Sequence, residues 1–212
     1  MAKCILFDLD GTLTDSGEGI MNCAELALKH FGLPIPDRET MRVFVGPPLD
    51  KTFREFGVPA DRTKEAIEVY RSRYTTIGKW ENEPYPGVEE LLKKLQAGGY
   101  RLFVATSKPE EMSIEILTKF GLAPYFETIC GATLDGTRGK KEEVIDYLLK
   151  TTDISGGITM VGDTVYDVEG AAHHRIPCIG VSWGYGKVAD MEAAGAAAIA
   201  TTMDALYDLL TA

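Results

Sequence analysis

The chain has 212 residues, of which 45% are hydrophobic and 25% charged, proportions typical of a globular protein with a sizeable core. Its formal net charge of −10 argues against nucleic acid and anionic membranes as partners, because phosphate groups attract basic surfaces. The four cysteines are scattered without the spacing of a zinc site, which indicates small buried side chains in a reducing compartment. No signal peptide opens the sequence and no apolar run is long enough to cross a bilayer, so we expect a cytoplasmic protein.

The first predicted element is a short buried strand over residues 4–7. It ends abruptly at Asp8 and Asp10, and Gly11 then allows a sharp turn of the chain. Two acids this close repel each other unless a cation or a shared proton intervenes. Taken alone, the stretch also fits a strand that enters an Asp-Gly hairpin turn.

The segment from Ser16 to Trp80 contains predicted helices and no predicted strand. Apolar residues recur there at helical spacing, and Asp37 is a plausible cap for the second helix. A rigid loop is expected at Val45–Leu49, where two prolines follow a glycine. The expected helices cover residues 20–31, 37–43, 50–56 and 60–77.

Strands alternate with helices after Gly87, and this order predicts right-handed βαβ units in a parallel sheet. The strands read as continuous apolar runs, as expected when helices cover both faces of the sheet. Expected strands cover residues 101–105, 125–130, 158–161, 177–181 and 197–200. Expected helices cover residues 88–97, 110–120, 140–150, 165–173 and 203–210.

The fold class that follows is α/β, a doubly wound, Rossmann-like parallel sheet with an inserted all-helical cap domain. Residues 1–15 and 84–212 are expected to form the core, because a lone first strand must join the later sheet. Residues 16–83 are expected to form the cap, with hinges near 15–19 and 81–87. Such a cap would lie over the carboxyl ends of the strands as a lid.

Three predicted strands end in polar residues at the same edge of the sheet, where open parallel sheets bind ligands. The first gives Asp8 and Asp10, the second Thr106, and the third Asp163, with Asp167 one helical turn further if a helix begins there. Four carboxylates facing one mouth require a hard cation, and oxygen ligands suit Mg²⁺. Lys140 or Lys141 can add the positive charge that phosphoryl transfer needs.

On these residues the chain resembles the haloacid dehalogenase superfamily of phosphatases. The signature Asp-x-Asp-Gly-Thr is Asp8 to Thr12, the strand-end threonine is Thr106, and the motif Gly-Asp-x-x-x-Asp runs from Gly162 to Asp167. The third motif is a lysine, and the order and approximate spacing of all four match over the whole chain. The helical insertion is similar to the cap of the subgroup that contains phosphoglycolate phosphatases.

The resemblance implies a role for each motif. Asp8 would attack phosphorus and form an aspartyl-phosphate, and Asp10 would act as acid and then as base. Mg²⁺ would be held by the Asp8 carboxylate, the Asp10 main-chain carbonyl, Asp163 and Asp167. Thr106 and the lysine would bind phosphate oxygens. Further candidates for phosphate or substrate binding are Gly11, Thr12, Ser107, Lys108, Lys140 and Gly46.

Two departures from the family pattern stand out. Ser107 occupies a position where many relatives carry Asn, and the motif lysine is doubled. We favour Lys141 over Lys140 because it lies three residues before Val144, as in close relatives. Lys108 fits a solvated lysine and a phosphate contact equally well, and Gly46 suits a cap loop that reaches the mouth. Gly184–Ala189 imitates a dinucleotide fingerprint, but a loop closing one side of the site is the better interpretation.

We therefore expect a Mg²⁺-dependent phosphatase acting on a small phosphorylated metabolite through an aspartyl-phosphate. Phosphoglycolate, a sugar phosphate and a nucleotide are all open as substrates. A phosphomutase with the same core, and a regulatory module with an idle site, are the alternatives. We expect a monomer or homodimer.

Overall fold

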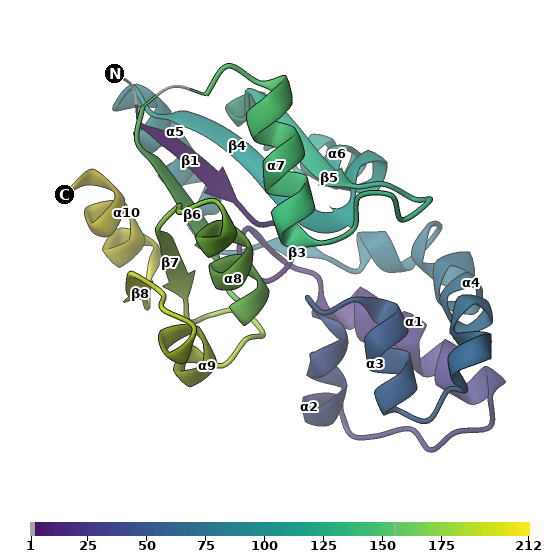
Figure 1. Ribbon diagram of the computed structural model, residues 1–212. Helices are drawn as coiled ribbons and strands as arrows, with labels where there is room; N and C mark the ends of the chain where they lie inside the picture. The colour runs from purple at the N-terminus through teal and green to yellow at the C-terminus, as the bar shows by residue number, and fades with distance from the viewer. Residues whose placement is uncertain (1–2, 155) are drawn as a thin grey trace.

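Strand β1 (Cys4–Phe7) lies in the interior of a six-stranded sheet with the order β5-β4-β1-β6-β7-β8. Figure 1 shows this sheet in the computed structural model, which describes residues 3–154 and 156–212. Every neighbouring pair of strands is parallel. The other strands are β4 (Arg101–Pro109), β5 (Thr128–Ala132), β6 (Ile158–Gly162), β7 (Cys178–Val181) and β8 (Ala198–Ala200). The predicted doubly wound sheet is confirmed.

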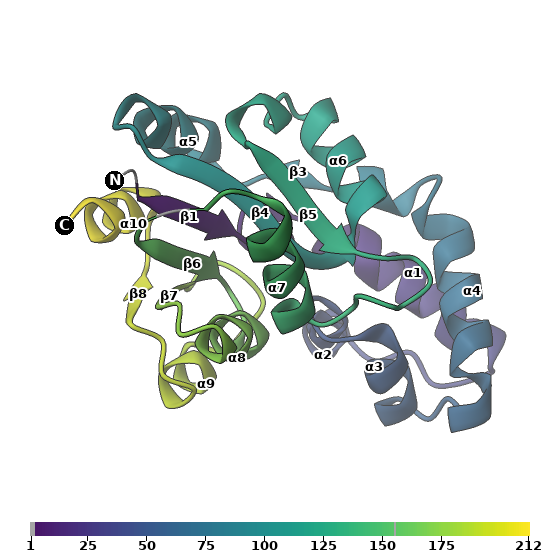
Figure 2. The same cartoon turned by 45° about the horizontal axis from the view of Figure 1, so that its top comes forward.

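Helices cover both faces of the sheet, so its strands alternate between two buried layers (Figure 2). Ile5 and Phe7 face α5 (Val88–Ala97) and α10 (Met203–Thr211), with α6 (Glu110–Lys119) adding Leu117. Cys4 and Leu6 face the layer formed by α7 (Lys141–Thr151), α8 (Val165–His173) and α9 (Val188–Ala193). With both faces covered, the strands contain little polar sequence before their carboxyl ends.

The helices between residues 16 and 81 form a separate group with its own apolar core (Figure 1). Phe44, Phe53 and Tyr70 pack there with their ring centroids 5.2 to 6.4 Å apart. The Asp37 side chain accepts a hydrogen bond of 2.8 Å from Thr40 N, which confirms the predicted cap. The helices of this group are α1 (Gly17–His30), α2 (Arg38–Met41), α3 (Leu49–Glu55) and α4 (Thr63–Tyr74), with 3-10 turns at Arg42–Phe44, Ala60–Arg62 and Gly78–Trp80.

The two segments that join the helical group to the sheet pair with each other. Strand β2 (Thr14–Asp15) is antiparallel to β3 (Glu83–Pro84), with Asp15 opposite Glu83. This ribbon lies at the two positions where the hinges are expected. This arrangement agrees with the predicted division of the chain into a core of residues 1–15 and 84–212 and a cap of residues 16–83. The division itself stays a prediction.

Several element boundaries differ from the prediction. Strand β4 continues to Pro109 through an irregularity after Ala105, and this carries Thr106 to Lys108 along the sheet edge. The predicted strand at 125–130 begins only at Thr128, because Ala123–Tyr125 forms a 3-10 turn with Pro124 in its first turn. Helix α9 was not predicted. Within the described residues 3–154 and 156–212, no helix combines the length and the apolar character needed to cross a bilayer.

Candidate active site

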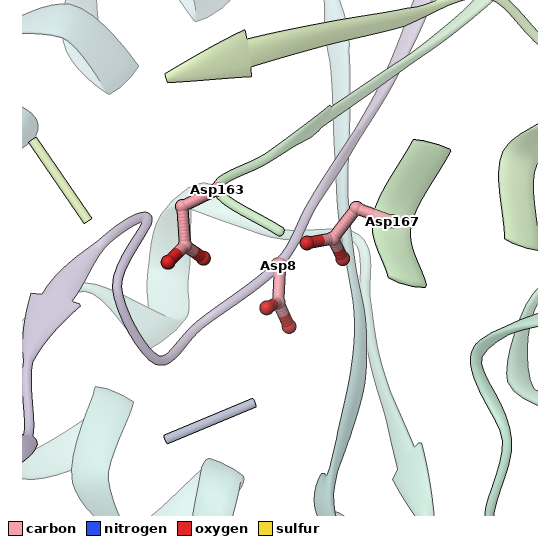
Figure 3. Close-up of side chains that lie close together, drawn as sticks. All are labelled: Asp8, Asp163 and Asp167. Atoms are coloured by element: carbon pink, nitrogen blue, oxygen red, sulfur yellow. The ribbon is translucent and has the colours of Figure 1, made fainter. Parts of the chain in front are cut away.

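Three buried carboxylates from different parts of the chain meet at the carboxyl edge of the sheet (Figure 3). Asp8 follows β1, Asp163 follows β6, and Asp167 lies in the first turn of α8. Each offers an oxygen atom within 4.8 Å of the others. Because parallel strands end at the same edge, residues more than 150 positions apart become neighbours.

Lys141 neutralises part of this negative charge. Its Nζ lies 2.7 Å from Asp8 Oδ1 and 2.7 Å from Asp167 Oδ1, and it donates a hydrogen bond of 2.9 Å to Ala105 O. Lys140, by contrast, is exposed and occupies the N-cap position of α7. The structure therefore brings Lys141 and not Lys140 to the carboxylates, as the spacing favours.

The single positive charge of Lys141 does not balance the charge of the three carboxylates. Burial raises the pKa of Asp8 to about 6, and Asp167 adds to this rise, while Lys141 opposes it. Burial, followed by Asp167 and Asp8, raises the pKa of Asp163 above its ordinary value. Burial alone would lower the pKa of Lys141, but Asp167 and Asp8 hold it above its usual range.

Asp167 is fixed by the start of helix α8. Thr164 is the N-cap, and both its N–H and its hydroxyl donate to Asp167 Oδ2, at 3.0 and 2.9 Å. The helix begins at Val165, so Asp163 precedes it rather than lying one turn before Asp167 on the same helical face. The two acids still converge, because the loop between β6 and α8 turns Asp163 toward Asp8 (Figure 3).

Asp163 is held by two loops on its other side. Thr12 Oγ1 donates to Asp163 Oδ1 at 3.2 Å, and Tyr185 N donates to Asp163 Oδ2 at 2.8 Å. A side chain on Gly11 or Gly184 would collide with the Asp163 carboxylate, so both positions require glycine. Residues 184–187 thus form a loop beside the site, as the sequence indicates, but the predicted loop ends there because helix α9 begins at Val188. Gly11 and Thr12 contact Asp163 and do not line the cavity described below, so their predicted phosphate binding stays untested.

Asp10 and Lys108 form a partly buried ion pair next to the three carboxylates. Lys108 Nζ lies 2.8 Å from both carboxylate oxygens of Asp10, and 4.8 Å from the ring centroid of Tyr74 in α4. Only 7% of Lys108 is exposed, so it is not a solvated lysine. The Asp10 side chain is not part of the three-carboxylate group, and the expected metal contact of its main-chain carbonyl stays a prediction.

A cavity of about 270 Å³ opens above these residues, between the sheet edge and the helical group. Asp8, Asp10 and Thr106 line its floor together with Ser107, Lys108 and Lys141. Gly46 lines the opposite side, as the sequence predicts, and a Cβ there would lie 3.0 Å from Thr164 Cγ2. A larger cavity of about 520 Å³, between α5 and α10, contains none of these residues.

Part of the cavity wall comes from α1 and α4 and was not predicted from the sequence. Ile67, Tyr70, Arg71 and Tyr74 line the cavity, together with Ile20. Their helical spacing indicated only a core-facing stripe. Two tyrosines and an arginine share this stripe, and polar side-chain ends rarely face a dry core. This composition could have indicated that the stripe faces a cavity.

The residues present fit a divalent cation. Three buried carboxylates and one lysine leave two negative charges at the cluster. The side-chain atoms that could ligate a metal are all carboxylate oxygens. Hard cations such as Mg²⁺ prefer oxygen ligands, and an ion would offset the burial and the carboxylate repulsion that raise the pKa of Asp8 and Asp163.

Comparison with known proteins agrees with this geometry. The family model described as haloacid dehalogenase-like hydrolase matches residues 5–181, which includes both acidic motifs, Thr106 and Lys141. The chain belongs to this family. The prediction of a phosphoric monoester hydrolase is confirmed at the level of the family, where curated relatives are named as phosphatases.

Three curated relatives illustrate the range of names among similar proteins. A 5'-nucleotidase of Pseudomonas aeruginosa is 41% identical over 89% of this chain and 86% of its own length. Tyrosine-protein kinase PtkA of Mycobacterium tuberculosis is 40% identical over 98% of this chain and 72% of its length. A phosphoglycolate phosphatase of Aquifex aeolicus is 34% identical over 88% of this chain and 87% of its length.

Solved structures share the complete fold. A predicted phosphatase from Clostridium acetobutylicum superposes with a TM-score of 0.95, at 40% identity over 100% of this chain and 99% of that chain. The PtkA structure superposes with a TM-score of 0.87, at 40% identity over 99% and 98% of the two chains.

Proposed function

We propose that the protein is a Mg²⁺-dependent phosphatase that hydrolyses a small phosphate monoester through an aspartyl-phosphate on Asp8. The observation that carries the proposal is the position of Asp8, which lies on the cavity floor within the acidic group and in contact with Lys141. Mg²⁺ would be held by Asp8, Asp163 and Asp167 and by the Asp10 main-chain carbonyl. When bound, it would neutralise the transferring phosphoryl group.

The side chains of the cavity floor supply the chemistry. An Asp8 oxygen attacks phosphorus, and the bond from phosphorus to the ester oxygen breaks. Asp10 donates a proton to the leaving alkoxide and then takes a proton from the water that hydrolyses the intermediate. Thr106 and Lys141 offset charge on the phosphoryl oxygens. Lys108 keeps the Asp10 carboxylate within the cavity through their ion pair.

The leaving group faces a largely apolar wall. Tyr70 and Tyr74 are stacked at a centroid distance of 5.2 Å, and Phe44 and Ile67 extend this surface, with Arg71 beside it. A flat leaving group gains more from such a wall than a small carboxylate does. Phosphoglycolate, a sugar phosphate and a nucleotide therefore remain the substrate panel, and we expect the nucleotide to give the highest kcat/KM.

The test is hydrolysis of an aryl phosphate by the parent protein and by Asp8→Asn, with Mg²⁺ and with a chelator. We expect Mg²⁺-dependent phosphate release that falls on the order of 10⁴-fold in Asp8→Asn, as when a catalytic group is removed. The matched control is Asp146→Asn, which removes a charge from an exposed ion pair on α7. Activity that survives in Asp8→Asn would exclude Asp8 as the nucleophile.

One relative gives a second candidate, transfer of the phosphoryl group to a tyrosine, because a protein 40% identical to this chain is named a tyrosine kinase. Incubation with ATP and a tyrosine-containing peptide distinguishes the two. Labelled peptide without phosphate release would support the kinase.

Two further alternatives have their own outcomes. Isomerised sugar phosphate without phosphate release would support a phosphomutase. Tight binding of phosphate esters with no turnover of any kind would support an idle regulatory module.

A further inference from the structure

Tyr185 connects the acidic site to the hinge of the helical group. Its main-chain N–H donates to Asp163 Oδ2 at 2.8 Å. Its hydroxyl donates to Asp15 Oδ1 and accepts a hydrogen bond of 2.7 Å from Gly17 N. Asp15 is the last residue of hinge strand β2, and Gly17 is the first residue of α1. One residue therefore holds an acid of the site by its backbone and the hinge by its side chain.

The helical group also contacts this loop directly, through Arg42. The Arg42 guanidinium lies 4.9 Å from the centroid of the Tyr185 ring, and Arg42 Nη2 donates to Gly184 O at 3.0 Å. A Cβ on Gly17 would come within 2.5 Å of the Tyr185 hydroxyl, so this approach depends on glycine. Movement of α1 about the β2–β3 ribbon must break these bonds or displace the loop that holds Asp163.

We propose that Tyr185 is a positioning residue that couples the placement of the helical group to the orientation of Asp163. When the hydroxyl of Tyr185 is bonded to Asp15 and Gly17, its backbone N–H is fixed in the place from which it orients the Asp163 carboxylate. The inference rests on the proposed Mg²⁺ site. It follows that Mg²⁺ binding stabilises the bonded hinge, and that the bonded hinge strengthens Mg²⁺ binding by the same factor.

The test measures this coupling without substrate. Amide hydrogen exchange of Gly17 and the Mg²⁺ dissociation constant from isothermal titration are recorded for the parent and for Tyr185→Phe. The substitution removes the hydroxyl and keeps the ring beneath Arg42 and the N–H bonded to Asp163. In the parent we expect Mg²⁺ to slow Gly17 exchange about fivefold or more, at the low end of couplings between sites. In Tyr185→Phe we expect no effect of Mg²⁺ on this amide and a dissociation constant raised by a similar factor.

The matched control is Tyr125→Phe, because Tyr125 also donates its hydroxyl to a carboxylate, Glu89 Oε1 at 3.0 Å, on the far side of the core. It should retain the parent behaviour. Asp15→Ala removes the other partner of the Tyr185 hydroxyl, so the double variant should weaken Mg²⁺ binding no more than either single variant. Asp15→Asn keeps an acceptor oxygen and should restore most of the coupling.

Two outcomes would overturn the inference while the phosphatase proposal stands. The first is Mg²⁺ affinity in Tyr185→Phe within twofold of the parent, even with a lower melting temperature, since that is the signature of a purely structural contact. The second is Gly17 exchange in the parent that does not respond to Mg²⁺. A parent that neither binds Mg²⁺ nor hydrolyses a phosphate ester would overturn both proposals together.

Discussion

At the scale of single residues, adjacent side chains of the same type have opposite environments. Lys140 is exposed at the start of α7, while Lys141 lies buried among two carboxylates and a main-chain carbonyl. A buried charge that loses its partner costs far more free energy than an exposed one. The doubled lysine is therefore a natural matched pair for experiment.

We predict that Lys141→Met lowers the free energy of unfolding by about 3–5 kcal/mol in the presence of a chelator, because it leaves Asp8 and Asp167 without a cation. Lys140→Met should leave the free energy of unfolding nearly unchanged. Urea unfolding of both variants beside the parent measures the difference. Equal destabilisation by the two substitutions would contradict the placement of Lys141.

At the scale of elements, the linker segment before β3 is held to the helical group by one ion pair. Arg73 of α4 binds Glu81 through two hydrogen bonds of 2.7 and 2.6 Å, and Asn22 of α1 donates to the same carboxylate at 3.2 Å. The Arg73 hydrogen bonds lower the pKa of Glu81, against the opposing effect of burial. Three elements thus meet at Glu81 next to the hinge ribbon.

This ion pair makes the stability of the helical group depend on pH. Because the pKa of Glu81 is lower in the folded protein than in the unfolded chain, the pair stabilises the fold above the unfolded value of about 4.3. That stability is lost as the pH falls through the folded-state pKa. We expect Glu81→Gln to lower the free energy of unfolding by about 1 kcal/mol at pH 7, and the difference to shrink below pH 4.

Thermal unfolding of the parent and Glu81→Gln across this pH range measures the effect. Glu68→Gln, which changes an exposed acid on helix α4 that also carries Arg73, is the control and should show no such trend. A difference that stays constant down to the lowest pH would mean that the ionised carboxylate contributes nothing.

For the molecule as a whole, the acidic site lowers the stability of the folded protein. The cluster of Asp8, Asp163 and Asp167 contains more negative charge than Lys141 neutralises, in a protein whose formal net charge is already −10. Folding without an ion must therefore bury unbalanced carboxylates. A ligand that binds only the folded state recovers this free energy by mass action.

We predict that Asp163→Asn melts at a higher temperature than the parent in the presence of a chelator, because a buried negative charge is removed. Mg²⁺ at a hundredfold excess over its dissociation constant should stabilise the parent by about 2.7 kcal/mol, or about 5 °C or more. Asp163→Asn should show no such rise, and Asp146→Asn should behave as the parent. Scanning calorimetry with and without Mg²⁺ measures both effects, and a lower melting temperature for Asp163→Asn in chelator would contradict the charge argument.

Local sequence patterns were sufficient to predict the sheet, the helical insertion and the acidic residues that follow its strands. The apolar runs that stop at Asp8 and Asp163 mark the carboxyl ends of two parallel strands, and such ends meet at one edge of the sheet. The run that stops at Thr106 marks the point where the pairing of β4 becomes irregular, although the strand continues to Pro109. Capping chemistry is equally local, which is why Asp37 was found from the sequence.

The preference for Lys141 over Lys140 came from its spacing in relatives, and the fold places it beside Asp8 and Asp167. The pairing of Lys108 with Asp10 and the link from Asp163 through Tyr185 to Asp15 appear only in the folded chain. These contacts depend on how far a side chain reaches across a loop, and helical or strand periodicity carries no information about that distance. The spacing of Tyr70 and Tyr74 is equally uninformative, since a stripe that faces a core and one that faces a cavity have the same spacing, and only the polar ends of these side chains distinguish the two.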